Sequence, residues 1–110
     1  MMFGFAKHRL QLLEAERDRI AAVAAQFGAL RMVLVGDLAE GRVGPTSELE
    51  LVVVQDTDEP FHRRADFWVG HVRPRVGTRF LVYTPEEFET LEQDDPVLRW
   101  AHSRGEVLVG

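Results

Sequence analysis

The segment from Leu49 to Val54 constrains the fold more than any other part of this sequence. It reads Leu-Glu-Leu-Val-Val-Val, and no polar residue follows Glu50 within it. A strand with one face in water alternates apolar and polar residues, whereas an uninterrupted apolar run is typical of a strand buried on both faces. The chain is therefore expected to form a sheet that other elements cover on both sides.

The rest of the pattern predicts the elements around this strand. Apolar residues at helical spacing indicate an amphipathic helix over about residues 5–27 and another over about 60–72. Strands are expected at 30–35, 78–83 and 106–109, and the segment 37–47 is turn-rich. Thr84-Pro85 and Asp95-Pro96 are typical starts of two further helices. This order predicts a single-domain α/β sandwich over residues 1–110. The helix at 60–72 is expected to face the sheet through Phe61, Ala65, Trp68, Val69 and Val72.

Composition excludes several kinds of function. The 110 residues include no cysteine, which excludes disulfide frameworks, thiolate zinc sites, iron–sulfur sites and thiol catalysis. There are 13 Lys and Arg against 18 Asp and Glu, and the net charge of −5 argues against strong nucleic-acid binding, since phosphate contacts need clustered cations. The histidines are scattered without metal-ligand spacing, so zinc is not expected. Neither a secretory signal nor a membrane span is recognisable, which predicts a cytoplasmic protein without membrane association.

Acidic residues gather where two of the predicted strands begin and end. Gly36-Asp37 ends the strand at 30–35, and ten residues later Glu48-Leu49-Glu50 begins the next strand. Side chains two apart on a strand point to the same face, so Glu48 and Glu50 are expected side by side. Two carboxylates on one face can hold a divalent ion, and a glycine turn with free N–H groups can hold phosphate. This arrangement is typical of metal-assisted phosphoryl or nucleotidyl transfer.

The sequence resembles the minimal nucleotidyltransferases of the DNA polymerase beta superfamily. Their signature is Gly-Ser, ten residues, then Asp-x-Asp before an aliphatic strand, and Gly36-Asp37 and Glu48-Leu49-Glu50 have the same spacing. The resemblance covers nearly the whole chain and implies a nucleotidyltransferase fold, a small mixed β-sheet packed against helices. Its further landmarks are Phe61-His62-Arg63-Arg64, Tyr83-Thr84-Pro85-Glu86-Glu87-Phe88 and Gly105-Glu106-Val107-Leu108.

The charged positions of the signature are altered in this chain. Asp37 replaces the serine that helps to hold the triphosphate, and Glu48 and Glu50 replace the two metal-binding aspartates. By alignment on the following Tyr-Thr-Pro, the third carboxylate of the family is replaced by Arg79, a cation that cannot bind metal. Arg79 is expected one strand away from the glutamates, about 5 Å, where it can pair with either of them. The metal site is thus predicted to be a salt-bridged surface that needs no cofactor.

Plainer interpretations of the same residues stay open. Glu48 and Glu50 are also compatible with two solvent-facing acids at the start of a strand. Asp37 is compatible with a turn former that follows Gly36. Arg79 is compatible with an exposed cation on an edge strand.

Two classes of function follow from the resemblance. In the first, the chain is catalytically inactive and antitoxin-like, and it acts through a protein partner, for which the resemblance implies a helical HEPN-like protein as a candidate. In the second, it is an active nucleotidyltransferase that moves NMP from an NTP to a hydroxyl acceptor. Glu48 and Glu50 would then hold Mg²⁺, and Gly36 and Asp37 would lie beside the nucleotide.

A third interpretation is a homodimer without a ligand. The exposed apolar residues near Trp68 or Trp100 would then form the contact. Arg63 and Arg64 are expected on a solvated helix face, where they are also available to an acidic partner.

Overall fold

The computed structural model describes residues 4–90 and 93–110. The helices and strands follow one another in the order predicted, and α2 is an additional element that the sequence pattern did not indicate. In chain order the elements are α1 (Phe5–Ala24), the 3-10 turn η1 (Ala25–Phe27), β1 (Arg31–Val35), α2 (Asp37–Glu40), β2 (Leu49–Val54), α3 (Phe61–Val72), β3 (Thr78–Tyr83), α4 (Pro85–Thr90), α5 (Pro96–Arg104) and β4 (Glu106–Val109).

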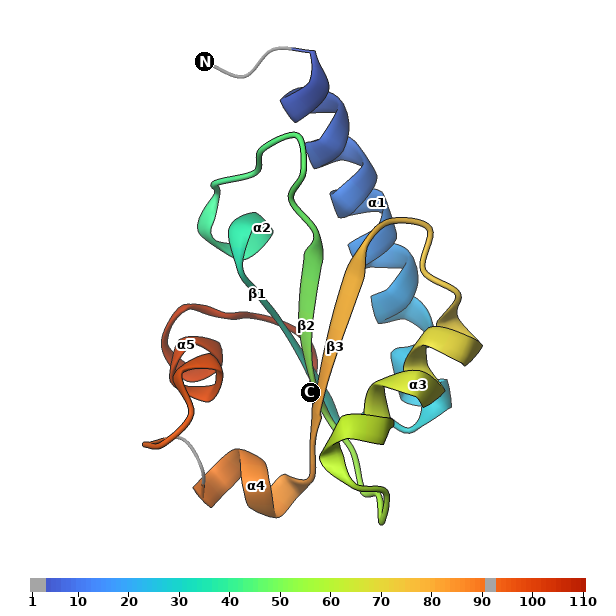
Figure 1. The fold of residues 1–110 in the computed structure, drawn as a ribbon, viewed down its shortest axis with the longest axis vertical. Coiled ribbons are helices and arrows are strands. Elements are labelled where there is room, and N and C mark those ends of the chain that lie inside the picture. Colours follow the sequence, from blue (N-terminus) through green and yellow to red (C-terminus); the bar gives the residue numbers. More distant parts are fainter. Residues whose placement is uncertain (1–3, 91–92) are drawn as a thin grey trace.

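In the described residues, four strands form one mixed sheet in the order β3-β2-β1-β4. Figure 1 shows β3, β2 and β1 of this sheet. β2 runs parallel to β3 and antiparallel to β1, and β4 is antiparallel to β1. A parallel pair needs a crossover connection, which α3 supplies between β2 and β3. The register of this pair runs from Leu49 opposite Thr78 to Val54 opposite Tyr83. The prediction of a small mixed sheet packed against helices is confirmed.

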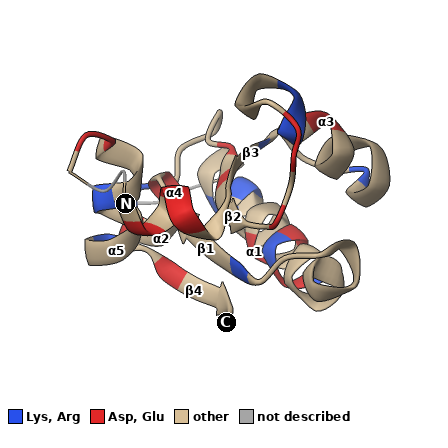
Figure 2. Cartoon of the chain, turned by 90° about the horizontal axis from the view of Figure 1, so that it is seen from below, with Lys and Arg blue, Asp and Glu red and all other residues tan. Residues whose placement is uncertain are grey.

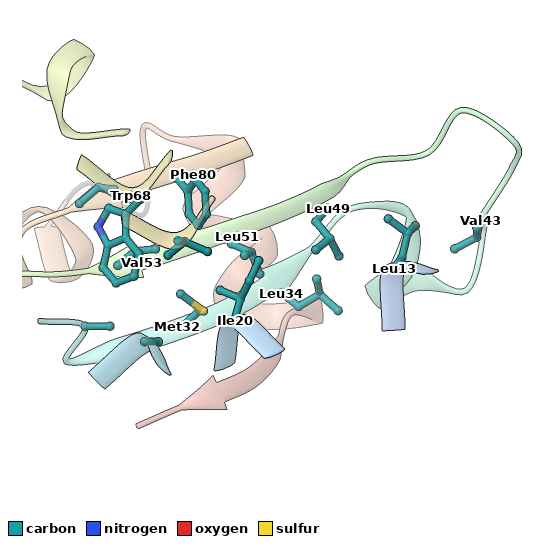
Figure 3. Packing of buried hydrophobic residues seen from close by; sticks show 14 residues of the cluster. Leu13, Ile20, Met32, Leu34, Val43, Leu49, Leu51, Val53, Trp68 and Phe80 are labelled. Carbon is teal, nitrogen blue, oxygen red and sulfur yellow. The ribbon is translucent and has the colours of Figure 1, made fainter. Parts of the chain in front are cut away.

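α1 and α3 cover one face of the sheet. Alternate side chains of β2 point to this face, and they include Leu51 and Val53 (Figure 3). They pack with Leu34 of β1 against Ile20 of α1 and Trp68 of α3. All five of these side chains have no exposed surface.

α4 and α5 cover the opposite face. Val52 and Val54 of β2 point to it and pack with Phe88 of α4 and Leu98 of α5. β2 is therefore buried from both sides, as its uninterrupted apolar run predicts. Across residues 4–90 and 93–110, every helix is too short or too polar to span a lipid bilayer.

The predicted helix starts after β3 are confirmed by their hydrogen bonds. The backbone N–H of Glu87 donates to Thr84 Oγ1 at 3.2 Å, and the backbone N–H of Thr84 donates to Glu87 Oε1 at 2.8 Å. These reciprocal bonds form a capping box at the start of α4. Asp95 caps α5, because its Oδ1 accepts from the N–H of Val97 at 2.9 Å and Pro96 takes the first helical position.

Three expectations for α3 are wrong. Val69 does not face the sheet and is about half exposed, and Phe61, the first residue of α3, is 46% exposed. Arg64 does not lie on a solvated face, because its side chain is only 9% exposed. Its guanidinium crosses the edge of β3, donates to the carbonyl of Val82 at 3.1 Å, and pairs with Glu87 of α4 at 2.5 Å. The long aliphatic stem of an arginine allows its charged end to reach these acceptors while the stem packs on apolar surface.

Glu16 of α1 is a buried carboxylate that accepts a hydrogen bond from the segment preceding β3. Arg19 donates to it through Nε and Nη2 at 2.7 and 2.9 Å, and the backbone N–H of Arg75 donates as well. Hydrogen bonding to the Arg19 guanidinium keeps the pKa of Glu16 below its ordinary value, although burial acts in the opposite direction. α1 is thereby fastened to the segment that precedes β3, the strand that carries Arg79.

Candidate functional site

Glu50 and Arg79 lie next to each other on the two parallel strands. Each is the second residue of its strand, and the register places them directly opposite one another. The Arg79 Nη1 atom lies 3.5 Å from Glu50 Oε1, and the two side chains are 61% and 32% exposed. An ion pair in such an environment contributes about 0.2–1 kcal/mol, so it changes the charge of this surface more than the stability of the fold.

The position of the pair on the sheet follows from the alternation of β2. Glu50 points to the same face as Val52 and Val54, the face that α4 and α5 cover. Those helices pack farther along the strands, against residues such as Tyr83. The end of the face that carries Glu50 and Arg79 is therefore open to solvent, as the exposure of both side chains shows.

The Glu50 carboxylate also lies against the glycine turn. Gly36 follows Val35, the residue of β1 that is paired with Glu50. Gly36 has φ 80° and ψ −155°, and a Cβ atom there would overlap the Glu50 carboxylate. The space above the backbone of this turn is thus filled by a carboxylate of the same chain.

Glu48 is placed differently from Glu50. It precedes the first residue of β2, it is exposed, and its carboxylate lies over Gly77, where a Cβ atom would overlap it. The two carboxylates therefore have different neighbours, Gly77 for Glu48 and Gly36 for Glu50. Within residues 4–90 and 93–110, no three side chains of His, Asp or Glu gather in a way that could hold a metal ion.

Asp37 is occupied by a hydrogen bond within the chain. It is the first residue of α2, and its Oδ2 accepts from the Ser47 hydroxyl at 2.7 Å. The same hydroxyl accepts from the backbone N–H of Gly44 at 2.9 Å, and Ser47 is buried. Asp37 thus holds the loop between α2 and β2 through Ser47, which the sequence pattern did not single out.

Replacing Ser47 with Ala is expected to lower the free energy of unfolding by about 1–2 kcal/mol. The substitution removes two hydrogen bonds and leaves the carboxylate of Asp37 and the N–H of Gly44 without this partner. Chemical denaturation of both proteins measures the difference. Thr46→Ala is the matched control, because the neighbouring Thr46 is exposed, and an equal loss in both variants would contradict this role of Ser47.

Glu40 is a second carboxylate of α2 that arginines neutralise. It contacts Arg42 Nη2 at 2.8 Å and Arg104 Nη1 at 3.3 Å, and Arg104 is the last residue of α5. Arg104 is 64 positions away in sequence, so no local pattern could indicate this contact. The acids around the turn at Gly36 are therefore paired with groups of the chain itself.

A separate groove of about 460 Å³ lies at the other ends of β2 and β3. Its lining does not include Gly36, Asp37, Glu48, Glu50 or Arg79, the candidate site residues. α4, which forms one side of the groove, is rich in acidic residues (Figure 2). An acidic lining of this kind disfavours phosphate. The groove is lined by Asp56, Thr57, Asp58, Thr84, Pro85 and Glu86.

Comparison with known proteins identifies the fold. The structure is similar to the crystal structure of a proposed nucleotidyltransferase from Sulfolobus solfataricus, with a TM-score of 0.62 and 14% sequence identity. The similarity covers 96% of this chain and 87% of the other. No protein-family profile matches the sequence, and no curated protein matches it. The chain thus has a nucleotidyltransferase fold, and at this identity the similarity shows the fold alone.

Proposed function

We propose that this chain is a catalytically inactive protein with a nucleotidyltransferase fold that acts in the cytoplasm through a protein partner. The observation that carries the proposal is the contact between Arg79 and Glu50 at 3.5 Å. The sequence resemblance implies a carboxylate at the position of Arg79. A guanidinium there neutralises a carboxylate that a metal ion would need.

The residues at this surface do not fit a magnesium site. Mg²⁺ requires near-ideal octahedral oxygen ligands and loses its water reluctantly. Glu50 would have to leave both Arg79 and Gly36 to become a ligand, and Glu48 would have to leave Gly77. With Arg79 included, the formal charge of these side chains is −1, too little to balance two divalent ions near a triphosphate.

The phosphate side of the site is also unsuited to a nucleotide. The Glu50 carboxylate covers the backbone of Gly36, and Asp37 is the next residue. Both acids repel phosphate, and neither Glu50 nor Asp37 can donate a hydrogen bond while ionised. Cations such as Arg42 and Arg104 lie near, but they are paired with Glu40.

A protein partner is the second part of the proposal. The resemblance implies a helical HEPN-like protein as a candidate, in an antitoxin-like pair. Several large apolar side chains are exposed, which is compatible with protein contacts. They include Phe5, Leu30, Phe61, Phe67, Val69, Trp100 and Val107.

Isothermal titration with ATP and Mg²⁺ tests the loss of nucleotide binding. We expect no measurable heat of binding and no rise in melting temperature with excess Mg²⁺ and ATP. Labelled NTP should leave no label on the chain or on an added hydroxyl acceptor. The control is the double variant E48Q/E50Q, which should behave as the wild type does. Magnesium-dependent binding that this variant abolishes would contradict the proposal.

An active nucleotidyltransferase is the alternative, and the exposure of Arg79 favours it. The side chain is 61% exposed and its contact with Glu50 is long, so Mg²⁺ and nucleotide together could displace it. NMP would then pass from an NTP to a hydroxyl, with Glu48 and Glu50 as the metal-binding residues. Transfer of label from an NTP separates the two functions, because the wild-type chain, with Arg79 in place, should modify a hydroxyl acceptor only if it is active.

A further inference from the structure

The outer surface of α3 contains a glycine that the chain itself does not require. Gly70 lies in the last turns of the helix, is exposed, and would present an added Cβ atom to open space, with nothing within 4 Å. Glycine inside a helix is destabilising relative to alanine. Within the described residues, no close contact compensates for this effect. Because Gly70 has no side chain, however, another chain can approach the backbone of α3 closely at this point.

An ordered aromatic ring lies beside Gly70. Phe67 is 40% exposed, yet its ring stacks on His71 with 4.2 Å between centroids and meets the edge of Trp68 at 5.9 Å. His71 is held in turn, because its Nδ1 lies 2.8 Å from the carbonyl oxygen of Phe67. An exposed ring that is already fixed loses little conformational entropy when a partner covers it. Aromatic side chains of this kind are typical anchors of protein interfaces.

The charges on this face are complementary to a second copy of the same face. Asp66 lies four residues before Gly70, and Arg73, which follows the last helical residue Val72, lies three residues after it; both residues are exposed. If two copies of α3 cross antiparallel at Gly70, Asp66 of each copy meets Arg73 of the other. Neither side chain has an ion-pair partner within residues 4–90 and 93–110. A twofold arrangement pairs the same residues twice, so each favourable contact is repeated.

We propose that the outer face of α3 is a self-association surface, through which two copies of the chain form a twofold dimer with their α3 helices antiparallel and crossing at Gly70. α3 runs along one side of the molecule (Figure 1). It packs on the face of the sheet opposite to Glu50 and Arg79. The dimer therefore leaves that surface open and is independent of the proposed function. One helix of 12 residues offers less area than a standard interface, so the association is reversible.

Sedimentation velocity of the full chain, from low micromolar to millimolar concentration, tests the proposal. We expect a concentration-dependent shift from monomer to dimer. Asp66→Arg and Arg73→Asp should each raise the dissociation constant about tenfold or more, since each places like charges opposite one another. The double variant D66R/R73D should restore the wild-type value. Both variants should fold, because Asp66 is exposed and Asp tolerates the φ of 51° at position 73.

Gly70→Gln separates an interface role from a structural one. Glutamine is the better helix former, so the melting temperature measured on the monomer should rise, while the long side chain should abolish the dimer. Trp100→Gln is the matched control on α5, where half of the tryptophan is exposed, and it should leave association unchanged. A monomer at every concentration would overturn the proposal. So would a dimer that tolerates the single charge reversals or depends on Trp100.

Discussion

Replacing Arg64 with Met is expected to lower the free energy of unfolding by about 3 kcal/mol. The side chain is 9% exposed and donates to the carbonyls of Glu59 at 2.8 Å and Val82 at 3.1 Å, as well as to the carboxylate of Glu87. Methionine keeps much of the aliphatic volume but leaves all three acceptors without these donors. Hydrogen bonds to charged groups contribute about 1.5–3 kcal/mol each, and the two carbonyls lose a charged donor, whereas Glu87 is 31% exposed and keeps the N–H of Thr84.

Urea denaturation of the wild type and the variant measures this loss. Arg63→Met is the matched control, because Arg63 is the preceding residue of α3 and is exposed, and its effect should stay within about 0.5 kcal/mol. Equal effects of the two substitutions would contradict the role assigned to Arg64.

The loss of stability caused by Arg64→Met should become smaller as the pH falls. The hydrogen bond from Arg64 holds the pKa of Glu87 below its ordinary value. A carboxyl group whose pKa is lower in the folded chain stabilises the fold at pH values above its unfolded pKa. That stabilisation is lost as the pH falls through the folded pKa. The difference between wild type and Arg64→Met should therefore be full at neutral pH and should decrease in acid.

Arg64 also illustrates which contacts the sequence could not predict. Arg63 and Arg64 are adjacent and chemically identical, but Arg64 lies four residues before Trp68 and eight before Val72, on the buried side of α3. Its burial is decided by acceptors that come from other elements, the carbonyl of Val82 in β3 and Glu87 in α4. Such acceptors are known only when β3 and α4 are in place.

The fold itself could be predicted because its signals are local. The apolar run of β2 requires cover on two faces, and the capping box at Thr84 defines where α4 begins. α2 was not predicted because it has only four residues between Gly36 and Gly41, both at positive φ, and glycines of this kind also indicate turns. A helix of that length is formed by its surroundings, here by the bond from Ser47 to Asp37.

The sequence predicts which residues belong to the candidate site, but not which groups surround each of them. Its residues could be selected by spacing, but the neighbours of each carboxylate depend on how the strands and loops meet. The parallel register places Glu50 opposite Arg79. Glu48 lies instead over Gly77, which belongs to the segment before β3. Two carboxylates in an E-x-E motif need not share neighbours when one of them lies before the strand begins.

Replacing Gly36 with Ala is expected to lower the free energy of unfolding by about 2 kcal/mol. The backbone at φ 80° and ψ −155° is a conformation that glycine adopts freely and that costs other residues about 1–3 kcal/mol. The new Cβ atom would also displace the Glu50 carboxylate from the turn, and with it the contact to Arg79. This second effect is smaller, because an exposed ion pair contributes less than about 1 kcal/mol and a side-chain end can move.

A double-mutant cycle with Glu50→Ala separates the two causes. In the E50A background no carboxylate opposes the new methyl group, so the remaining cost of Gly36→Ala is the cost of the backbone conformation alone. Gly44→Ala is the matched control, since its φ is not in the left-handed region and its Cβ would meet only Ser47 Oγ, at 4.0 Å. We expect most of the loss to persist in the E50A background. If it vanishes there, the contact with Glu50 rather than the geometry of the turn explains why position 36 is a glycine.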